Sequence, residues 1–367
     1  MKTRLLFAVL FALAAYGLAR ADIIVVKGRE KALVGAVSAE DAKGITVKPA
    51  KLKVADELIP AADIVDIYYE DVRPVELILG GAYKSARDAE KESNESLDAA
   101  KRRTALTRAI AQYSDTLTKM NPHKYAKRMI EYKVATLTLR QALSEQLSTD
   151  KAVAKLQAFK TAHPTSWQMV HVMPLIAQTQ MDAKDYKGAA ATFQEMSELS
   201  ALPADVRISA ELEVVRVTVQ SGDINMAQKR LDALTVKAAG NPQFASRVKM
   251  VKAEVLVGQG KMKDAVPILQ QVIKENNDRQ IKAIAHNTLG ECYFKENRHN
   301  EALWEFLWVD AVFNQDKHQH AKALFYLWKT FELLNNAERA QECRETLLND
   351  KQFAGTEFQA KAAKEVK

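Results

Sequence analysis

The feature that most constrains this chain is an alanine that recurs at a nearly fixed interval. Each of these alanines follows a short polar connector, and they are Ala152, Ala189, Ala227, Ala265, Ala302 and Ala340, spaced by 37, 38, 38, 37 and 38 residues. A fainter anchor, Ala109, lies 43 residues before the first. A fixed period of this length is typical of repeat architectures, in which each unit is one supersecondary element stacked on its neighbours.

The residues around each anchor define the repeated unit. Five residues before it, the last four units have Gly222, Gly260, Asn297 and Asn335, and Gly and Asn tolerate the left-handed conformation that ends a helix. Large apolar residues occur four and seven positions after it, on the same helix face as the alanine. They are Leu156, Phe193, Leu231, Leu269 and Phe306, then Phe159, Met196, Leu234, Val272, Val309 and Leu347. The pattern predicts a unit of helix, tight turn and helix, whose apolar face is buried by stacking on the next unit.

One stretch matches a known repeat at several positions. Leu289, Gly290 and Tyr293, followed by Ala302 and Phe306, have the spacing of the tetratricopeptide repeat (TPR) family, which residues 100–350 resemble. The resemblance implies a mainly α fold, an α-solenoid of about six or seven TPR-like hairpins. The period exceeds the family's roughly 34 residues, so HEAT-type repeats of roughly 40–47 residues are the alternative. The Gly or Asn turn and the alanine anchor favour the tetratricopeptide interpretation.

Residues 22–72 have a different character. Short β-branched runs at 22–27, 31–37, 45–48, 57–60 and 63–69 are separated by turn-forming residues. They predict a small antiparallel β barrel or sheet. The layout resembles the SH3-like or Sm-like mini-barrels that precede helical regions in some exported bacterial proteins. Because a unit of this size buries only about 60% of its unfolded surface, we expect it to dock on the helices.

The first 21 residues have the three parts of a secretory signal peptide. Lys2 and Arg4 form the basic start, an apolar run follows as far as Ala15, and residues 19–21 resemble an A-x-A cleavage site. The run is too short for the ~20 residues of a membrane-spanning helix, and no later stretch approaches that length. We expect an exported protein of the periplasm or cell envelope, with no membrane span after cleavage. The expected domains are the signal peptide over 1–21, the β domain over 22–72, the helical repeats over 73–350 and a charged C-terminal tail over 351–367.

The mature chain is modestly positive. The formal net charge of +7 falls to +4 without residues 1–21, which carry Lys2, Arg4 and Arg20 and no acidic residue. Such an excess is typical of a solvated surface, and export removes most of the reason to expect a nucleic acid partner.

Catalytic motifs are absent from the sequence. The Gly-Gln-Gly-Lys run at 258–261 resembles part of a phosphate-binding loop, but Val255 replaces the first glycine and Met262 replaces the residue that binds magnesium. His318 and His320 are the strongest metal candidates, yet residues at i and i+2 diverge on a helix, and solvated histidines are the favoured interpretation. We expect a protein that is not an enzyme and that has no cofactor and no metal site.

Two further features concern individual side chains. Cys292 and Cys343 are expected in helices that are not direct neighbours, which favours two buried thiols over a disulfide. Eight aromatic residues fall between positions 304 and 331. They predict either a heavily packed final pair of hairpins or an exposed binding surface, for which Trp304 and Phe325 are the candidates.

The resemblance to tetratricopeptide repeats implies a concave groove lined by the first helix of each unit. The residues that should face it lie eleven or fifteen positions before the anchors, and the candidates are Gln178, Arg216, Glu254, Asn287, Glu291, Phe325 and Lys329. Such a groove has mixed charge and lacks the Lys and Asn clamp that some family members use for a C-terminal carboxylate. The alternative is that these residues are ordinary solvent-facing positions.

These features together predict a non-catalytic scaffold or adaptor that holds a protein partner in the bacterial cell envelope. A stacked array would present its groove to an extended segment or a helix of that partner. The alternative function is a glycan- or peptidoglycan-binding envelope protein that uses the β domain or the late aromatic cluster. An enzyme whose residues converge from separate repeats is a third interpretation, which no sequence feature supports.

Overall fold

The computed structural model describes residues 21–49, 55–69, 81–119, 124–145, 147–238, 242–353 and 356–365. The predicted signal peptide, apart from Ala21, lies outside these ranges. No helix within them is both long enough and apolar enough to cross a membrane.

The chain begins with a five-stranded sheet. Its strands are β1 (Asp22–Val26), β2 (Leu33–Asp41), β3 (Gly44–Pro49), β4 (Glu57–Pro60) and β5 (Ile64–Tyr68), and their order across the sheet is β4-β3-β2-β1-β5. Every neighbouring pair is antiparallel, as the sequence predicts. The sheet is not closed into a barrel, so of the two predicted forms the open sheet is the correct one.

The connection between the two edge strands shows that the sheet is curled. β4 is joined to β5 by one turn of 3-10 helix, Ala61–Asp63 (η1), although these strands lie at opposite edges. Five flat strands would hold their outer members about 19 Å apart, since neighbouring strands are separated by ~4.8 Å. The chain from Pro60 to Ile64 can span at most about 14 Å. The two edges therefore approach each other at this end, and register shifts in β1 and β2 allow the bend.

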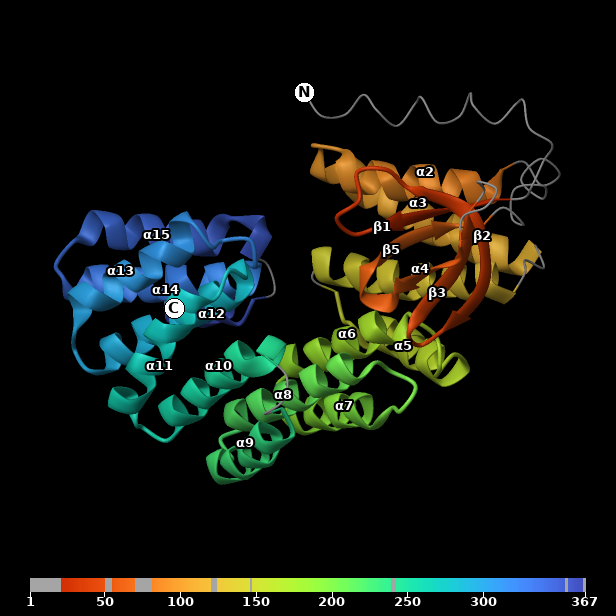
Figure 1. The fold of residues 1–367 in the computed structure, drawn as a ribbon. Helices are drawn as coiled ribbons and strands as arrows, with labels where there is room; N and C mark the ends of the chain where they lie inside the picture. The colour runs from red at the N-terminus through yellow and green to blue at the C-terminus, as the bar shows by residue number, and fades with distance from the viewer. Residues whose placement is uncertain are drawn as a thin grey trace. The chain divides into compact units, whose positions relative to one another are not determined.

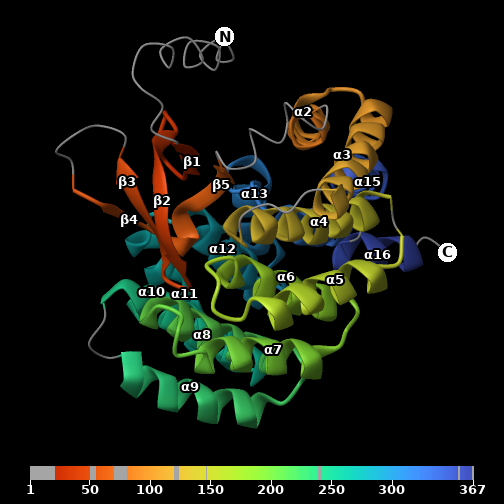
Figure 2. The ribbon, with the colours of Figure 1, turned by 90° about the vertical axis from the view of Figure 1, so that its right-hand side faces the viewer.

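One face of the sheet packs against the first helices. α2 (Ala82–Glu95), α3 (Ala99–Lys119) and α4 (Lys124–Ser144) lie beside it (Figure 1, Figure 2). Ile24, Ile45 and Ile67 of the sheet share a core with Tyr83 of α2 and Met129 of α4, and all five are at most 2% exposed. The prediction that the β unit docks on helices is confirmed.

From α5 onward the chain consists of helices in succession. They are α5 (Asp150–Ala162), α6 (Met169–Asp182), α7 (Tyr186–Glu198), α8 (Ala204–Gln220), α9 (Ile224–Ala238), α10 (Pro242–Gly258), α11 (Met262–Glu275), α12 (Arg279–Lys295), α13 (His299–Ala311), α14 (Lys317–Leu333), α15 (Ala337–Asn349) and α16 (Glu357–Glu365). The fold is mainly helical, a TPR-like solenoid preceded by a small sheet, which is the class that the sequence predicts.

The chain divides into two compact units. The first comprises residues up to Gln141 together with Lys155–His171, and it contains the sheet, α2 and α3. The second comprises Ala142–Ala154 and Val172–Lys367. The sheet and the first helices belong to one unit because they share one core.

The six anchor alanines lie in the second helices of successive pairs. They belong to α5, α7, α9, α11, α13 and α15 and are at most 3% exposed. The large residues four and seven positions after them are at most 7% exposed. Ala302, for example, shares a core with Leu289 and Cys292 of the partner helix α12. A side chain as small as alanine allows the two helices to approach closely, and the larger residues fill the space beside it.

The turn before each second helix has the predicted left-handed residue. Gly222, Gly260, Asn297 and Asn335 have φ values of 86°, 77°, 60° and 57°. Lys184 has the same place in an earlier unit and adopts a φ of 61° without being Gly or Asn. A left-handed residue ends the first helix and lets the chain reverse within a few residues.

Successive pairs pack through their first helices. α8 contacts α10, α10 contacts α12, and α12 contacts α14, so that these helices follow one another along the second unit (Figure 1). α16 takes the next place, where it contacts α14 and α15 and buries Ala362. Residues 357–365, within the predicted charged tail, thus form a cap over the last pair, which an open repeat array needs.

The two helices of a pair approach each other closely at Gly290 of α12. A β-carbon at this position would lie 2.6 Å from a ring carbon of Phe306 in α13. Alanine is the better helix former by about 1 kcal/mol, but overpacking a core costs roughly 1–3 kcal/mol. We expect Gly290→Ala to lower the free energy of unfolding, measured by chemical denaturation, by about 1 kcal/mol.

Gly258→Ala is the matched control. A β-carbon there would first meet the terminal methyl of Ile224, at 2.7 Å, and this flexible side chain can rotate away. The control should be neutral or stabilising. Equal destabilisation by the two substitutions would show that contact with Phe306 is not the cause.

Candidate functional site

Charged side chains run across the first helices of the second unit. Arg216 of α8 donates from Nε to Oε2 of Glu254 in α10 at 3.0 Å, and from Nη1 to Oε1 of Glu213 at 3.1 Å. The side chains of Arg216 and Glu254 are only 22% and 19% exposed. Two charges this far from water need good mutual geometry to offset their desolvation, so the contact fixes α8 against α10.

The line of charges continues on α12 and α14. Lys322 of α14 forms an ion pair with Glu291 of α12, and Tyr326 donates from its hydroxyl to the same carboxylate at 3.4 Å. Lys329, further along α14, forms an ion pair with Glu365 of α16. Each of these contacts joins one first helix to the next. We call the following set the charged row: Glu213, Arg216, Glu254, Glu291, Lys322 and Lys329.

Burial changes the titration of the central pair. Burial has the largest effect on Glu254 and raises the pKa of its carboxyl, although Arg216 acts in the opposite direction. Burial also disfavours the charged guanidinium of Arg216, but the carboxylates of Glu254 and Glu213 outweigh it and raise its pKa. The raised pKa of Glu254 favours its protonated form, whereas the raised pKa of Arg216 depends on a charged Glu254 beside it. Because arginine stays charged and donates to this carboxyl at 3.0 Å, we assign Glu254 as a carboxylate at neutral pH.

Most of the groove candidates that lie eleven positions before the anchors belong to the charged row. Four of them are in the charged row and are 15–26% exposed, namely Arg216, Glu254, Glu291 and Lys329. Gln178, the equivalent residue of α6, is exposed, and its amide donates to Asp182 at 2.9 Å.

Asn287 and Phe325, predicted fifteen positions before the anchors, do not face a groove. They are 0% and 9% exposed. Asn287 donates to the backbone and side-chain oxygens of Gln319 in α14, both at 2.9 Å. Phe325 packs against Phe358 of α16, with ring centroids 5.5 Å apart. The prediction is wrong for these two because this position lies in the seam between adjacent first helices.

Two members of the charged row are not among the predicted residues. Glu213 lies three positions before Arg216, and Lys322 lies seven before Lys329, so each shares a helix face with a predicted residue. Extending the predicted face by three and seven positions would have identified them.

His318 and His320, the two histidines considered as metal ligands, lie in the first turn of α14. His320 contacts Oδ1 of Asp310 from Nε2 at 2.7 Å. Asp316 caps the start of α14, where it accepts from the backbone N–H of His318. Among the residues that the structure describes, no three His, Cys, Asp or Glu side chains are grouped in a way that could hold a metal ion.

Both cysteines are free thiols, as predicted in preference to a disulfide. Cys292 is buried and Cys343 is partly buried. Burial raises the pKa of each thiol to about 12. The thiolate fraction at neutral pH is therefore very small, and neither cysteine has the properties of a nucleophile.

The late aromatic cluster contains both buried and exposed rings. Phe306 and Trp328 are 0% and 4% exposed, whereas Trp304 and Trp308 are 66% and 50% exposed. The predicted exposure of Trp304 is confirmed, and that of Phe325 is wrong because α16 covers it.

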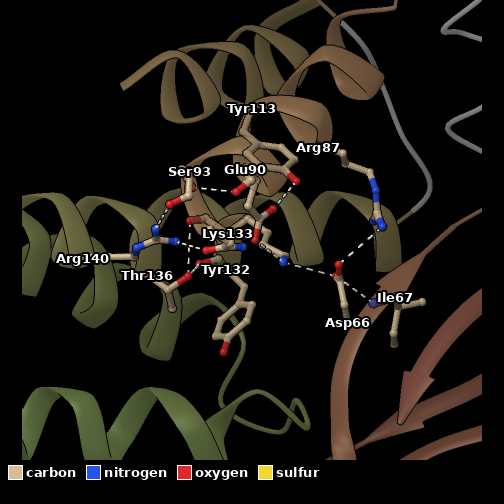
Figure 3. A network of polar contacts seen from close by, with 11 residues as sticks. Asp66, Ile67, Arg87, Glu90, Ser93, Tyr113, Tyr132, Lys133, Thr136 and Arg140 are labelled. Atoms are coloured by element: carbon tan, nitrogen blue, oxygen red, sulfur yellow. Dashed lines mark hydrogen bonds and ion pairs between the residues drawn. The ribbon is translucent and has the colours of Figure 1, made fainter. Parts of the chain in front are cut away.

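A second polar network lies in the first unit (Figure 3). Lys133 of α4, 12% exposed, donates from Nζ to Oε1 of Glu90 in α2 at 2.7 Å and lies 3.3 Å from Oδ1 of Asp66 in β5. Arg87 of α2 lies 3.5 Å from Oδ2 of Asp66, and Tyr113 of α3 donates to Oε2 of Glu90 at 2.6 Å. The network joins the edge strand β5 to three helices.

The perturbed groups of this network are compensated by one another. Burial disfavours the charged form of Lys133, but Asp66 and Glu90 outweigh it and raise its pKa. Burial, followed by the Glu90 carboxylate, raises the pKa of Tyr113 well above its ordinary value. Perturbed pKa values mark functional sites or structural ion networks. Because the five groups of the network pair with one another, we interpret the network as structural.

Comparison with protein families identifies one stretch of the second unit. Residues 209–323, from α8 into α14, match the tetratricopeptide repeat-like domain. The match contains all of the charged row except Lys329, and it covers less than half of the chain. No curated protein matches this chain significantly.

Several solved structures are similar to this chain at low sequence identity. A tetratricopeptide repeat protein from Parabacteroides merdae has 12% sequence identity and a TM-score of 0.49, and the match covers 76% of this chain and 99% of that one. NprR in complex with its cognate peptide NprX has 13% identity and a TM-score of 0.46, with 68% and 78% covered. YrrB, described as a TPR protein with an unusual peptide-binding site, has 21% identity and a TM-score of 0.32, with 53% and 91% covered.

Lys133→Met tests whether the network in the first unit is structural. Methionine removes the charge and leaves Asp66 and Glu90 without their shared lysine. Breaking a buried ion pair in this way costs about 3 kcal/mol or more. We expect that loss in the opening free energy of the β1 and β5 amides, measured by hydrogen exchange.

Lys119→Met is the control, because its ion pair with Asp115 is 63% and 40% exposed. It should change the same quantity by less than about 1 kcal/mol. If the two variants behave alike, Lys133 does not hold the sheet on the helices.

Proposed function

We propose that this protein is a non-catalytic scaffold or adaptor that binds a partner protein along the charged row. The observation that carries the proposal is that charged side chains of four successive first helices form the row, in which Arg216 pairs with Glu254 and Lys322 pairs with Glu291. Its charged groups lie at the surface but are only partly hydrated, with exposures of 15–26% for all members except Glu213. Groups that are already partly desolvated lose less hydration when a partner covers them.

The spacing of the row suits an extended segment of the partner. Packed helices lie about 8–10 Å apart, and an extended chain advances ~3.3 Å per residue. About one residue in three of a bound segment would therefore meet one first helix. The charges along the row are positive at Arg216, negative at Glu254 and Glu291, and positive at Lys322. This order favours a partner that carries both signs and disfavours a uniformly charged polymer.

The proposal includes a location in the bacterial cell envelope. Its support is the sequence of residues 1–21, with a basic start, an apolar core and a small-residue end. The proposal also relates the sheet to SH3-like or Sm-like mini-barrels. Its support is the curled five-strand order, in which one 3-10 turn joins β4 to β5.

Glycan or peptidoglycan binding is a second candidate function. The observation that favours it is the exposure of Trp304 and Trp308, since exposed aromatic rings serve as anchors for a ligand. Sedimentation with purified cell wall distinguishes the two candidates. Co-sedimentation that Trp304→Ala abolishes would favour the glycan candidate, whereas the scaffold is expected to stay in solution.

Exchanging the central ion pair tests the scaffold function. Arg216→Glu combined with Glu254→Arg keeps an attraction between α8 and α10 but reverses the charges that a partner meets. We expect this variant to fold with a modest loss of stability, because the new carboxylate on α8 lies beside Glu213. In cross-linking of intact cells it should lose about 90% or more of the captured partner, because charge reversal turns attraction into repulsion.

The control exchanges another ion pair of the same helix. Lys249 of α10 lies 3.1 Å from Glu275 of α11, and its position is roughly 140° around the helix axis from Glu254. Lys249→Glu combined with Glu275→Lys should leave capture unchanged. The proposal fails if both exchanged proteins capture the same partners in the same amounts.

A further inference from the structure

Two tryptophans are exposed on a side of the second unit away from the charged row. Trp304 and Trp308 of α13 are one helical turn apart, so both side chains lie on one face. They are 66% and 50% exposed, although rings of this size gain most from burial. Together they leave on the order of 200–300 Å² of aromatic surface in water, the size of patch that often marks an interaction site.

The neighbouring helix contributes to the same surface. Arg279, Lys282 and His286 of α12 lie roughly 120–180° around the helix axis from Glu291, a member of the charged row. A ligand on this surface would therefore not touch the charged row of α12. We define the outer aromatic patch as Arg279, Lys282, His286, Trp304, Trp308 and Phe313.

Three rings of the patch, those of His286, Trp308 and Phe313, are held in place before any partner binds. The ring centroid of Trp308 lies 6.0 Å from that of His286 and 6.4 Å from that of Phe313. His286 and Phe313 stack on each other at 5.3 Å. The ring of His286 is fixed by a 2.7 Å contact between its Nδ1 and Oε2 of Glu305. Side chains that are already ordered lose little conformational freedom on binding.

Two positive charges border these rings without a carboxylate of their own. The guanidinium carbon of Arg279 lies 5.8 Å and Nζ of Lys282 5.9 Å from the ring centroid of Phe313. Arg279 donates to the side chain of Gln315 and to the carbonyl of Val312, both uncharged. Across the described ranges, neither cation takes part in an ion pair. The patch therefore combines an apolar surface with two cations that form no ion pair within the described ranges, while a neighbouring carboxylate, that of Glu305, contacts His286.

We propose that the outer aromatic patch is a second docking surface, which binds an acidic segment of a partner protein. A carboxylate of the segment would lie beside Arg279 and Lys282, and an aliphatic or aromatic side chain would cover Trp304 and Trp308. Charge complementarity favours this occupant, because a neutral glycan would cover the rings and leave both cations unpaired. Tryptophan and arginine are also the residues most enriched among the anchors of protein interfaces.

The test compares two synthetic peptides of equal length. In one, Phe and Leu alternate with Glu, and in the other they alternate with Lys. Binding to the full chain is measured by calorimetry and by tryptophan fluorescence. We expect the acidic peptide to bind about tenfold more tightly or better than the basic one, and added salt to weaken it.

Substitutions locate the binding on the patch. Trp304→Ala combined with Trp308→Ala should abolish binding, and Lys282→Glu should weaken it by about tenfold. Lys274→Glu, which reverses the charge of an exposed lysine of α11, is the matched control and should keep the parent affinity. Circular dichroism and the melting temperature establish that each variant is folded.

Several results would overturn the assignment. They are failure of the acidic peptide to bind, equal binding of both peptides, and parent-like binding by the tryptophan double variant. Binding of a neutral chitin oligosaccharide that requires both tryptophans would assign the patch to glycans. Dimerisation that Trp304→Ala abolishes would assign it to a second copy of the chain. Because no substitution here touches the charged row, failure leaves the scaffold proposal to its own experiment.

Discussion

The close approach of the two helices in each pair is the constraint on which the second unit depends. A small residue must lie where the second helix crosses the first, and every anchor at this place is a buried alanine. Gly290, where a β-carbon would meet the ring of Phe306, shows how little space separates α12 from α13. The left-handed residues at the turns also allow this close approach, because they end one helix and let its partner begin within a few residues.

The same stacking creates the charged row. Successive helix pairs contact one another through their first helices. A side chain at this contact either packs in the seam between two first helices or reaches across the seam to the next one. Leu212 and Met250 fill it and are at most 2% exposed, whereas Arg216 crosses it to reach Glu254. The row is thus a structural contact between successive helix pairs and, in our proposal, the surface that a partner binds. A partner that binds there competes with internal ion pairs, so geometry and charge order contribute more to its selection than net charge does.

The sequence predicts the repeat well because its signals are local. The alanine interval, the Gly or Asn turns and the apolar positions all lie within one helical hairpin. The orientation of one hairpin relative to the next has no such signal, so the sequence places Asn287 and Phe325 in the groove, whereas they lie in the seam between first helices. The cap formed by α16 was also missed, because the composition of residues 351–367 resembles that of a solvated tail. In the first unit, Lys133 reaches Asp66 across a long stretch of chain, and no spacing in the sequence records that pairing.

The stability of anchor variants tests the central claim most directly. Ala265→Leu and Ala302→Leu would each place a large side chain at a fully buried point of helix contact. If close approach at the alanines holds the pairs together, each should lower the free energy of unfolding by roughly 1–3 kcal/mol, as overpacking does. Leucine variants as stable as the parent protein would contradict the account, because they would show that the helices do not need to meet at these positions.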